Sequence, residues 1–190
     1  GGSWSADGSI LFVPDYFSPI LKIPAGGGEP VAVSAEEQGT KKSYAWPSFL
    51  PDGRHFLYTV NEGLAGGQNN GIFVGSTDSK QASRVIPAIS NARYAPPGYI
   101  IYAKDGSLRA QPFDAARLEI HGEPWTLVDN VQYYAPSASY LFSISNNGFL
   151  SYITGAGAGN SRFAWFDRSG KEKGTVGDPG LLYSPRISHD

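Results

Sequence analysis

The chain of 190 residues contains no cysteine and no methionine, and only 17% of its residues are charged. Without cysteine it can have no disulfide, no thiolate metal site and no cysteine nucleophile. It also lacks a run of about 20 apolar residues, so no membrane-spanning helix and no direct membrane insertion are predicted. The opening "GGSWS" has none of the features of a signal peptide, and a first residue other than methionine indicates a processed chain or a piece of a longer one.

Charge and histidine are equally sparse. The formal net charge is -2, and no basic stripe is present, which argues against nucleic acid as a partner. The three histidines, His55, His121 and His189, are more than 60 residues apart and do not have the spacing of a metal site. We therefore predict no metal site, no cofactor and no catalytic residue.

Apolar residues make up 41% of the sequence and aromatic residues 13%, which is typical of a folded chain with a core. The 24 glycines and 14 prolines form a fifth of the chain and separate short apolar runs. This composition predicts many short strands joined by turns.

The predicted strands belong to a sequence repeat. The stretch "WPSFLPDGRHFLY" is echoed by "WSADGSILF", "YAPPGYIIY" and "FSISNNGFLSY", and their turn glycines Gly8, Gly53, Gly98 and Gly148 follow at intervals of 45, 45 and 50 residues. A period of 40 to 50 residues is typical of β-propellers. The second unit contains four apparent strands in the order "YAWPSFL", "RHFLYTV", "GIFVGSTD" and "ASRVIPA". Asp-Gly or Asn-Gly turns suit three of the units, whereas Pro97-Gly98 predicts a different turn in the third.

We therefore predict an all-β fold, a β-propeller of four-stranded antiparallel blades. The predicted blades are about 1–40, 41–88, 89–134 and 135–180, with a first strand of a fifth at 183–188. Four blades and one strand indicate a fragment, or a propeller completed by oligomerisation, and an open arc would favour self-association through its unpaired blade edges.

The same aromatic positions recur in each unit, and we interpret them as core between blades. Trp46 fits either the core or the rim. The positions read as core are Trp4, Phe12, Phe49, Tyr58, Tyr94, Tyr102, Ile144 and Tyr152.

Several stretches resemble the TolB-like, WD repeat-like β-propeller, and most closely the version that follows the kinase domain and membrane segment of bacterial serine/threonine protein kinases, especially of Acidobacteria. They include "WPSFLPDGRHFLYTV", "ISNARYAPPGYIIYAKDGSLRAQPFDAARLEIHGEP" and "FAWFDRSGKEKGTVGDPGLLYSPRIS". The resemblance covers nearly the whole chain. It implies an extracytoplasmic sensor or protein-interaction module of a larger bacterial protein, usually with six or more blades. This chain departs from that pattern because it has fewer blades, no kinase motif and no membrane helix.

No catalytic motif stands out. The serine-hydrolase pattern "GxSxG", the phosphate-binding loop and the calcium-loop pattern "DxDxDG" are absent. We interpret the adjacent Glu36 and Glu37 as part of a solvated connecting loop. The favoured function is a non-catalytic propeller that binds a protein, peptide or small ligand. The alternative is a hydrolase of glycosides or lactones, with carboxylates such as Glu62 meeting His55 or His121 in the channel.

Loops that gather on one face of a propeller carry the candidate ligand-binding site. Tyrosines suit recognition because each combines apolar area with a hydrogen-bonding tip, although each can equally pack on a neighbouring blade. The predicted ligand-binding residues are Tyr16, Tyr44, Asn91, Arg93, Lys104, Asp105, Tyr133 and Tyr134, with Phe17 as a further aromatic candidate.

Overall fold

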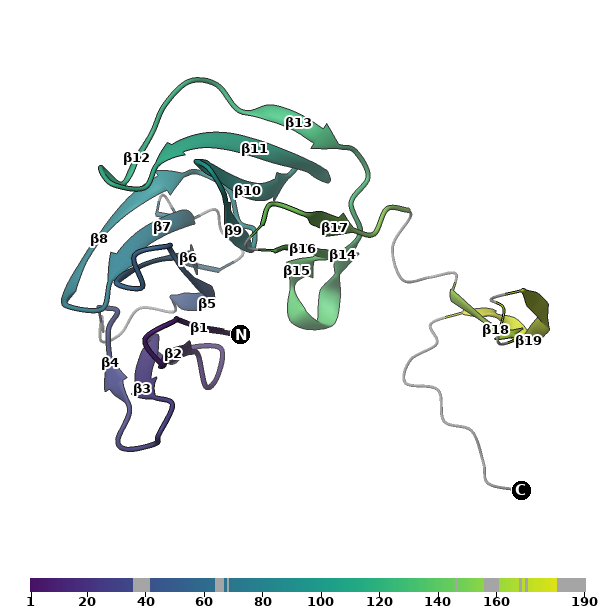
Figure 1. The fold of residues 1–190 in the computed structure, drawn as a ribbon, viewed down its shortest axis with the longest axis horizontal. Coiled ribbons are helices and arrows are strands. Elements are labelled where there is room, and N and C mark those ends of the chain that lie inside the picture. Colours follow the sequence, from purple (N-terminus) through teal and green to yellow (C-terminus); the bar gives the residue numbers. More distant parts are fainter. Residues whose placement is uncertain are drawn as a thin grey trace.

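The computed structural model of the chain is almost entirely β-structure, as Figure 1 shows. It describes residues 1–35, 42–63, 67, 69–145, 147–155, 161–167, 169 and 171–180. The helical element in this part is the 3₁₀ turn η1 (Ala135–Ser137). Across the described ranges no helix has the length and apolar character needed to span a bilayer.

The first two sheets are meanders of four antiparallel strands. Both sheets follow chain order, so each strand pairs with the next one along the chain. The first sheet, blade 1, contains β1 (Gly2–Trp4), β2 (Ser9–Phe12), β3 (Leu21–Pro24) and β4 (Val31–Ala32). The second, blade 2, contains β5 (Ser43–Phe49), β6 (His55–Asn61), β7 (Gly71–Ser76) and β8 (Ser79–Ile86).

The third sheet, blade 3, has five strands, one more than the repeat predicts. Its strand β11 is eight residues long, and two short strands share its outer edge: one pairs with Phe113 and Asp114, the other with Leu108 to Ala110. The strands are β9 (Ala92–Ala95), β10 (Tyr99–Lys104), β11 (Ser107–Asp114), β12 (Glu119–Ile120) and β13 (Trp125–Val128).

The fourth unit consists of hairpins. Each of its described sheets has two strands, and the predicted strand at 183–188 lies outside the described residues. We call the first two hairpins together the fourth blade; Figure 1 shows them beside β9, with the third hairpin farther away. The strands are β14 (Tyr133–Tyr134), β15 (Ser139–Tyr140), β16 (Phe142–Ile144), β17 (Leu150–Tyr152), β18 (Ser161–Phe166) and β19 (Glu172–Gly180).

The sheets are arranged as propeller blades. The first strands of blades 1 to 3 contact one another in chain order, from β1 to β5 and from β5 to β9, and β9 in turn contacts β16 of the fourth blade. Figure 1 shows these strands nearest the middle of the arc, with β4, β8 and β12 at its outer side. The predicted all-β fold of antiparallel blades is therefore confirmed.

Turn chemistry explains the hairpin that carries the repeat glycine in each unit, which is β1–β2, β5–β6 and β9–β10 in blades 1 to 3 and β16–β17 in the fourth blade. Gly8, Gly53 and Gly148 have φ values of 84°, 66° and 85°, in the left-handed region that glycine adopts without steric cost. The aspartate before Gly53 holds the turn, since Asp52 Oδ1 accepts hydrogen bonds from the amides of Arg54 and His55 at 3.0 and 2.9 Å. Gly98 does not have a positive φ, so the third turn differs in type, as predicted.

Three apolar clusters fill the spaces between successive blades. Alternating residues of β6 face opposite neighbours: Phe56 and Tyr58 pack toward blade 1, whereas Leu57 packs toward blade 3. Strand β10 divides in the same way, with Ile100 facing blade 2 and Ile101 facing the fourth blade. Because the inner strands have a neighbour on each side, they are apolar on both faces, and the repeat is a stack rather than a sandwich.

Three of the predicted core residues belong to none of these clusters, namely Trp4, Phe12 and Tyr152. Trp4 is 68% exposed and Tyr152 is 46% exposed. Ser3, next to Trp4, points toward blade 2 and accepts a hydrogen bond from the Phe49 amide at 3.0 Å, so Trp4 points to the opposite face of blade 1, which no described blade covers. By contrast, Tyr58 and Tyr102, which occupy the repeat position of Tyr152 in blades 2 and 3, are 5% and 3% exposed.

Buried polar contacts join the inner strands. Ser90 Oγ accepts the amide of Ala103 at 2.9 Å, and the Ser90 carbonyl accepts the hydroxyl of Thr59 at 2.6 Å. The side-chain amide of Asn91 pairs with the backbone of Tyr140, donating to its carbonyl at 3.0 Å and accepting from its amide at 2.9 Å. These bonds tie blades 2 and 3 and the fourth blade together around the centre of the arc.

Candidate functional site

A cavity of about 630 Å³ lies where the four repeat units approach one another. We call it the channel pocket. Its walls come from the connection between β2 and β3, from β5 and β6, and from the hairpin β14–β15, the elements that a propeller brings to the mouth of its channel. Its principal lining residues are Asp15, Tyr16, Ser43, Tyr44, Trp46, Thr59, Asn61, Ile89, Tyr133, Ser137 and Tyr140.

Tyrosine rings dominate one side of this pocket. The Tyr133 and Tyr140 rings meet edge to face with centroids 5.2 Å apart. Partial burial raises the pKa of Tyr133, and the nearby Tyr16 and Tyr140 phenols raise it further, so its hydroxyl stays protonated at neutral pH. Tyr16 and Tyr133 remain 65% and 45% exposed. The arrangement offers apolar ring area together with neutral hydroxyl groups.

Tyr44 forms a fixed part of the wall. Its hydroxyl donates to the carbonyl oxygen of Ala35 at 2.9 Å, and its ring lies 6.1 Å from the ring of buried Tyr58. Asp15, a charged residue in the lining, already has hydrogen-bond partners within its own loop. Its carboxylate accepts hydrogen bonds from the Ser18 hydroxyl at 2.7 Å and the Phe17 amide at 3.0 Å, and these bonds lower its pKa.

A second hollow of about 420 Å³ shares Trp46 and Tyr140 with the channel pocket. We call it the side pocket. It contains Asn91 and Arg93 from the start of blade 3, and the hydroxyls of Ser139, Ser143 and Ser151. Burial lowers the pKa of the Arg93 guanidinium, although not near the range in which an arginine would lose its charge.

The structure thus separates the predicted site residues into three groups. Tyr16, Tyr44 and Tyr133 line the channel pocket, and Asn91 and Arg93 line the side pocket. The remaining residues, Lys104, Asp105, Tyr134 and Phe17, line neither of the two.

The third group has identifiable positions. Lys104 and Asp105 lie at the turn between β10 and β11, where Gly106 accepts a hydrogen bond from the Val131 amide at 2.9 Å. Tyr134 precedes η1, and Phe17 packs its ring against Tyr16 at 6.0 Å. Asn91 also has a structural task, since both ends of its amide bind Tyr140.

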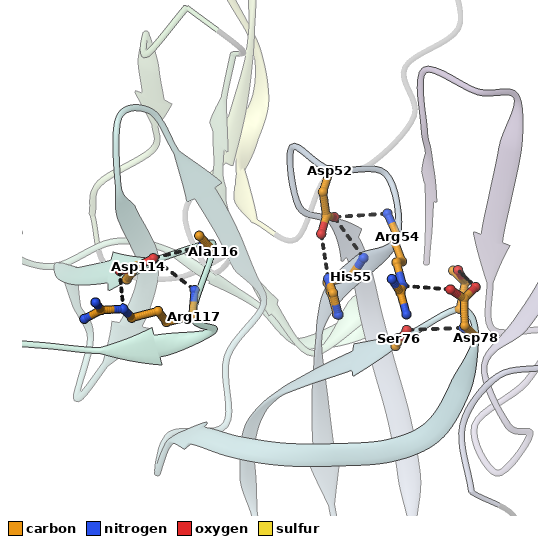
Figure 2. A network of polar contacts seen from close by, with 9 residues as sticks. Asp52, Arg54, His55, Ser76, Asp78, Asp114, Ala116 and Arg117 are labelled. Atoms are coloured by element: carbon orange, nitrogen blue, oxygen red, sulfur yellow. Dashed lines mark hydrogen bonds and ion pairs between the residues drawn. The ribbon is translucent and has the colours of Figure 1, made fainter.

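The histidines considered for a hydrolase lie elsewhere. Figure 2 shows His55, the first residue of β6, with its Nδ1 2.5 Å from Asp52 Oδ2, while neighbouring Arg54 binds Asp78 at 2.7 Å. His55 lines a groove of about 930 Å³ between the outer parts of blades 2 and 3, and His121 lines a different hollow beside Trp125.

The carboxylates of the same hypothesis have partners of their own. Glu62 accepts a hydrogen bond from the Asn69 side chain at 3.0 Å and lies 3.5 Å from the Lys42 ammonium. Asp114, also drawn in Figure 2, accepts two backbone amides beside Arg117. These carboxylates stabilise turns and loops, and none of the described residues that line the channel pocket is a histidine. Within the described ranges no group of three or more metal-ligating side chains is found.

Sequence reasoning missed two contributors, Trp46 and Tyr140. Tyr140 carries no motif, and it reaches the site because Asn91 holds its backbone from 49 residues away. Trp46 reaches the site through an irregularity in β5 that strand alternation does not predict. The proline that follows Trp46 is a local hint of such an irregularity.

The comparisons with known proteins give a distant likeness. No protein-family model matches the chain, and no curated protein does. A solved structure from a structural and mechanistic analysis of two prolyl endopeptidases is similar over 95% of this chain, with 18% identity and a TM-score of 0.45. The chain spans 27% of the length of that protein. A likeness at this level assigns neither a family nor an activity.

Proposed function

We propose that this chain is a non-catalytic binding module whose ligand, a small molecule or a peptide, occupies the channel pocket. The observation that carries the proposal is the pocket itself, which is assembled from all four repeat units and lined by Tyr16, Tyr133 and Tyr140. Pockets of this size with aromatic walls and a few polar groups are suited to ligand recognition. Among its described lining residues, no acid, base and nucleophile are arranged together for hydrolysis.

The resemblance of its motifs to kinase-linked propellers supports a wider role. On that basis we propose that the chain is the sensor or interaction part of a larger bacterial protein and acts outside the cytoplasm. The gene provides the test of this part of the proposal. A kinase domain and a membrane segment encoded upstream are expected, and a gene encoding neither would contradict the role.

The binding proposal is tested by ligand-observed NMR with a library of short peptides, sugars and amino-acid derivatives. Saturation-transfer signals are expected for at least one probe, and the Tyr16→Ala/Tyr133→Ala double variant should weaken that probe by roughly 10-fold or more, because two aromatic contacts are lost. Phe149→Ala is the matched control, since Phe149 is 75% exposed and lies outside the pocket. A probe that binds the double variant as tightly as the wild type would remove the channel pocket from consideration.

A further inference from the structure

Strand β5 carries one residue more than its partner needs. Ala45 pairs with Thr59 and Ser48 pairs with Leu57, so Trp46 and Pro47 together stand opposite Tyr58. This is a β-bulge. At the bulge Trp46 has a φ of 51°, an unfavourable backbone conformation that is rare for a bulky side chain. Strained residues of this kind cluster at functional sites.

Blade packing alone does not require the bulge. Tyr44 and Phe49 both pack toward blade 1. Their partners on β6, Val60 and Phe56, are four residues apart, and side chains an even number of pairing positions apart lie on the same face of a sheet. A regular strand shorter by one residue would keep both on the same face. The pairs β1–β2 and β9–β10 are regular. The extra residue therefore serves mainly to place an indole between the channel pocket and the side pocket.

Arg93 faces the same side pocket and has almost no internal partner. Its one hydrogen bond is a long one of 3.4 Å to the adjacent carbonyl of Ala92. Among the residues that the structure describes, no carboxylate pairs with it. A half-buried cation without a counter-charge is costly, and a ligand anion would offset that cost.

The remaining lining suits an anionic ligand. Among the residues that the structure describes, the side pocket lining contains three serine hydroxyls and no acidic side chain that would pair with Arg93 or repel an anion. A guanidinium binds a carboxylate with two parallel hydrogen bonds, and an indole offers a flat apolar face to a neighbouring ring or chain. The two groups come from adjacent blades and line one hollow.

We propose that the side pocket recognises an organic carboxylate, with Arg93 binding the carboxylate and Trp46 packing against the apolar group attached to it. This proposal rests on the proposed binding function, since the same ligand would extend past Trp46 into the channel pocket. It goes further because it specifies the charge and chemical class of the ligand.

The test compares two probes that differ in charge, N-acetylphenylalanine and N-acetylphenylalanine amide, by isothermal titration calorimetry. The acid is expected to bind wild-type protein roughly 10- to 100-fold more tightly than the amide, because it adds a charged bidentate contact. Arg93→Gln should remove that advantage, and Arg93→Lys should retain part of it. Lys104→Gln is the matched control, because it removes a positive charge at the exposed β10–β11 turn, outside both pockets.

A direct readout follows the Arg93 side chain itself. In ¹⁵N-labelled protein the Nε–Hε signal that disappears in Arg93→Lys should shift when the acid is added and should not shift with the amide. Equal affinities for acid and amide, including no binding of either, would overturn the carboxylate proposal, as would equal losses in Arg93→Gln and Lys104→Gln.

These outcomes are separate from the failure of the proposed function. If acid and amide bind equally, and the Tyr16→Ala/Tyr133→Ala variant weakens both, the channel pocket stands and the carboxylate site falls. If the acid binds through Arg93 and the tyrosine variant has no effect, the carboxylate site stands and the channel pocket falls.

Discussion

The two faces of blade 1 show what the repeat does and does not determine. One face packs against blade 2 through Leu11 and Ile20, which are both fully buried. The other face carries Trp4, paired with Ile10, and no described blade covers it. Both faces follow the same repeat pattern, so apolar side chains are present on each. Burial comes only from a neighbouring blade, and the self-association predicted from open blade edges stays a prediction.

The largest expected effect breaks the packed face. Phe56→Ala should lower the free energy of unfolding by about 3–5 kcal/mol, because it opens a cavity beside Tyr58 in a fully buried cluster. Trp4→Ala removes a larger ring yet should change stability by less than about 0.5 kcal/mol, since that ring is mostly exposed. Urea denaturation of both variants measures the difference. Similar losses in the two would show that blade 1 is covered on its second face in solution.

A smaller effect is expected at the joint between blade 3 and the fourth blade. Asn91→Ala removes both hydrogen bonds to Tyr140 and should cost about 1–3 kcal/mol, because a backbone donor and an acceptor lose their partner. Hydrogen exchange should accelerate first in β14–β17.

The control for this joint is Asn69→Ala, which alters an exposed asparagine bound to Glu62. It should leave exchange in β14–β17 unchanged. Uniform acceleration over all blades in Asn91→Ala would contradict a local joint and would indicate one cooperative unit.

The smallest effect concerns the turn that leads into the packed strand β6. Burial raises the pKa of Asp52, but hydrogen bonds from the His55 ring and from the amides of His55 and Arg54 lower it more, so the net pKa lies below its usual value of 3.8. A lowered folded-state pKa contributes stability above the unfolded pKa, and this contribution is lost as the pH falls. Asp52→Asn should therefore be less stable than wild type at pH 6.

The difference should begin to shrink below about pH 4, where the carboxyl group of the unfolded chain becomes protonated, and it should disappear once the pH is below the lowered folded-state pKa. Thermal unfolding across this range measures it. Asp178→Asn is the control, because it removes the charge of an exposed aspartate on β19 and leaves the Asp52 turn intact. A gap for Asp52→Asn that stays constant from pH 6 to pH 3 would rule out the charged form of Asp52 as its cause.

Much of the fold was predictable because its signals are local. The glycine turns and the strands around them follow from the spacing of Gly8 and Gly53 and from the apolar runs beside them. The run "FLYTV" is buried on both faces, which the stacked arrangement requires and which the sequence shows directly.

The site was less predictable because it depends on pairing between distant residues. From the sequence, Asn91 is interpreted as a polar contact for a ligand. In the structure its side-chain amide hydrogen-bonds the backbone carbonyl and amide of Tyr140, as a neighbouring strand would. In the sequence Trp46 looks like any other aromatic residue of a strand. Its place in the channel pocket follows from the irregular register of β5 against β6, which the sequence does not show. Tyr16 and Tyr133 both line the channel pocket, because loop order in a propeller fixes which connections gather on one face.

The bond between Asn91 and Tyr140 also bears on how the molecule assembles. It closes a loop of 49 residues, and the entropy lost on closing a loop of that size must be offset by contacts that already exist. Strands β9 to β11 are joined by short turns and can form early, whereas the amide has no partner until the β14–β15 hairpin arrives. We therefore expect the docking of this hairpin to be the last step of folding. Its rate should depend on how fast the contact between Asn91 and Tyr140, 49 residues apart, can form.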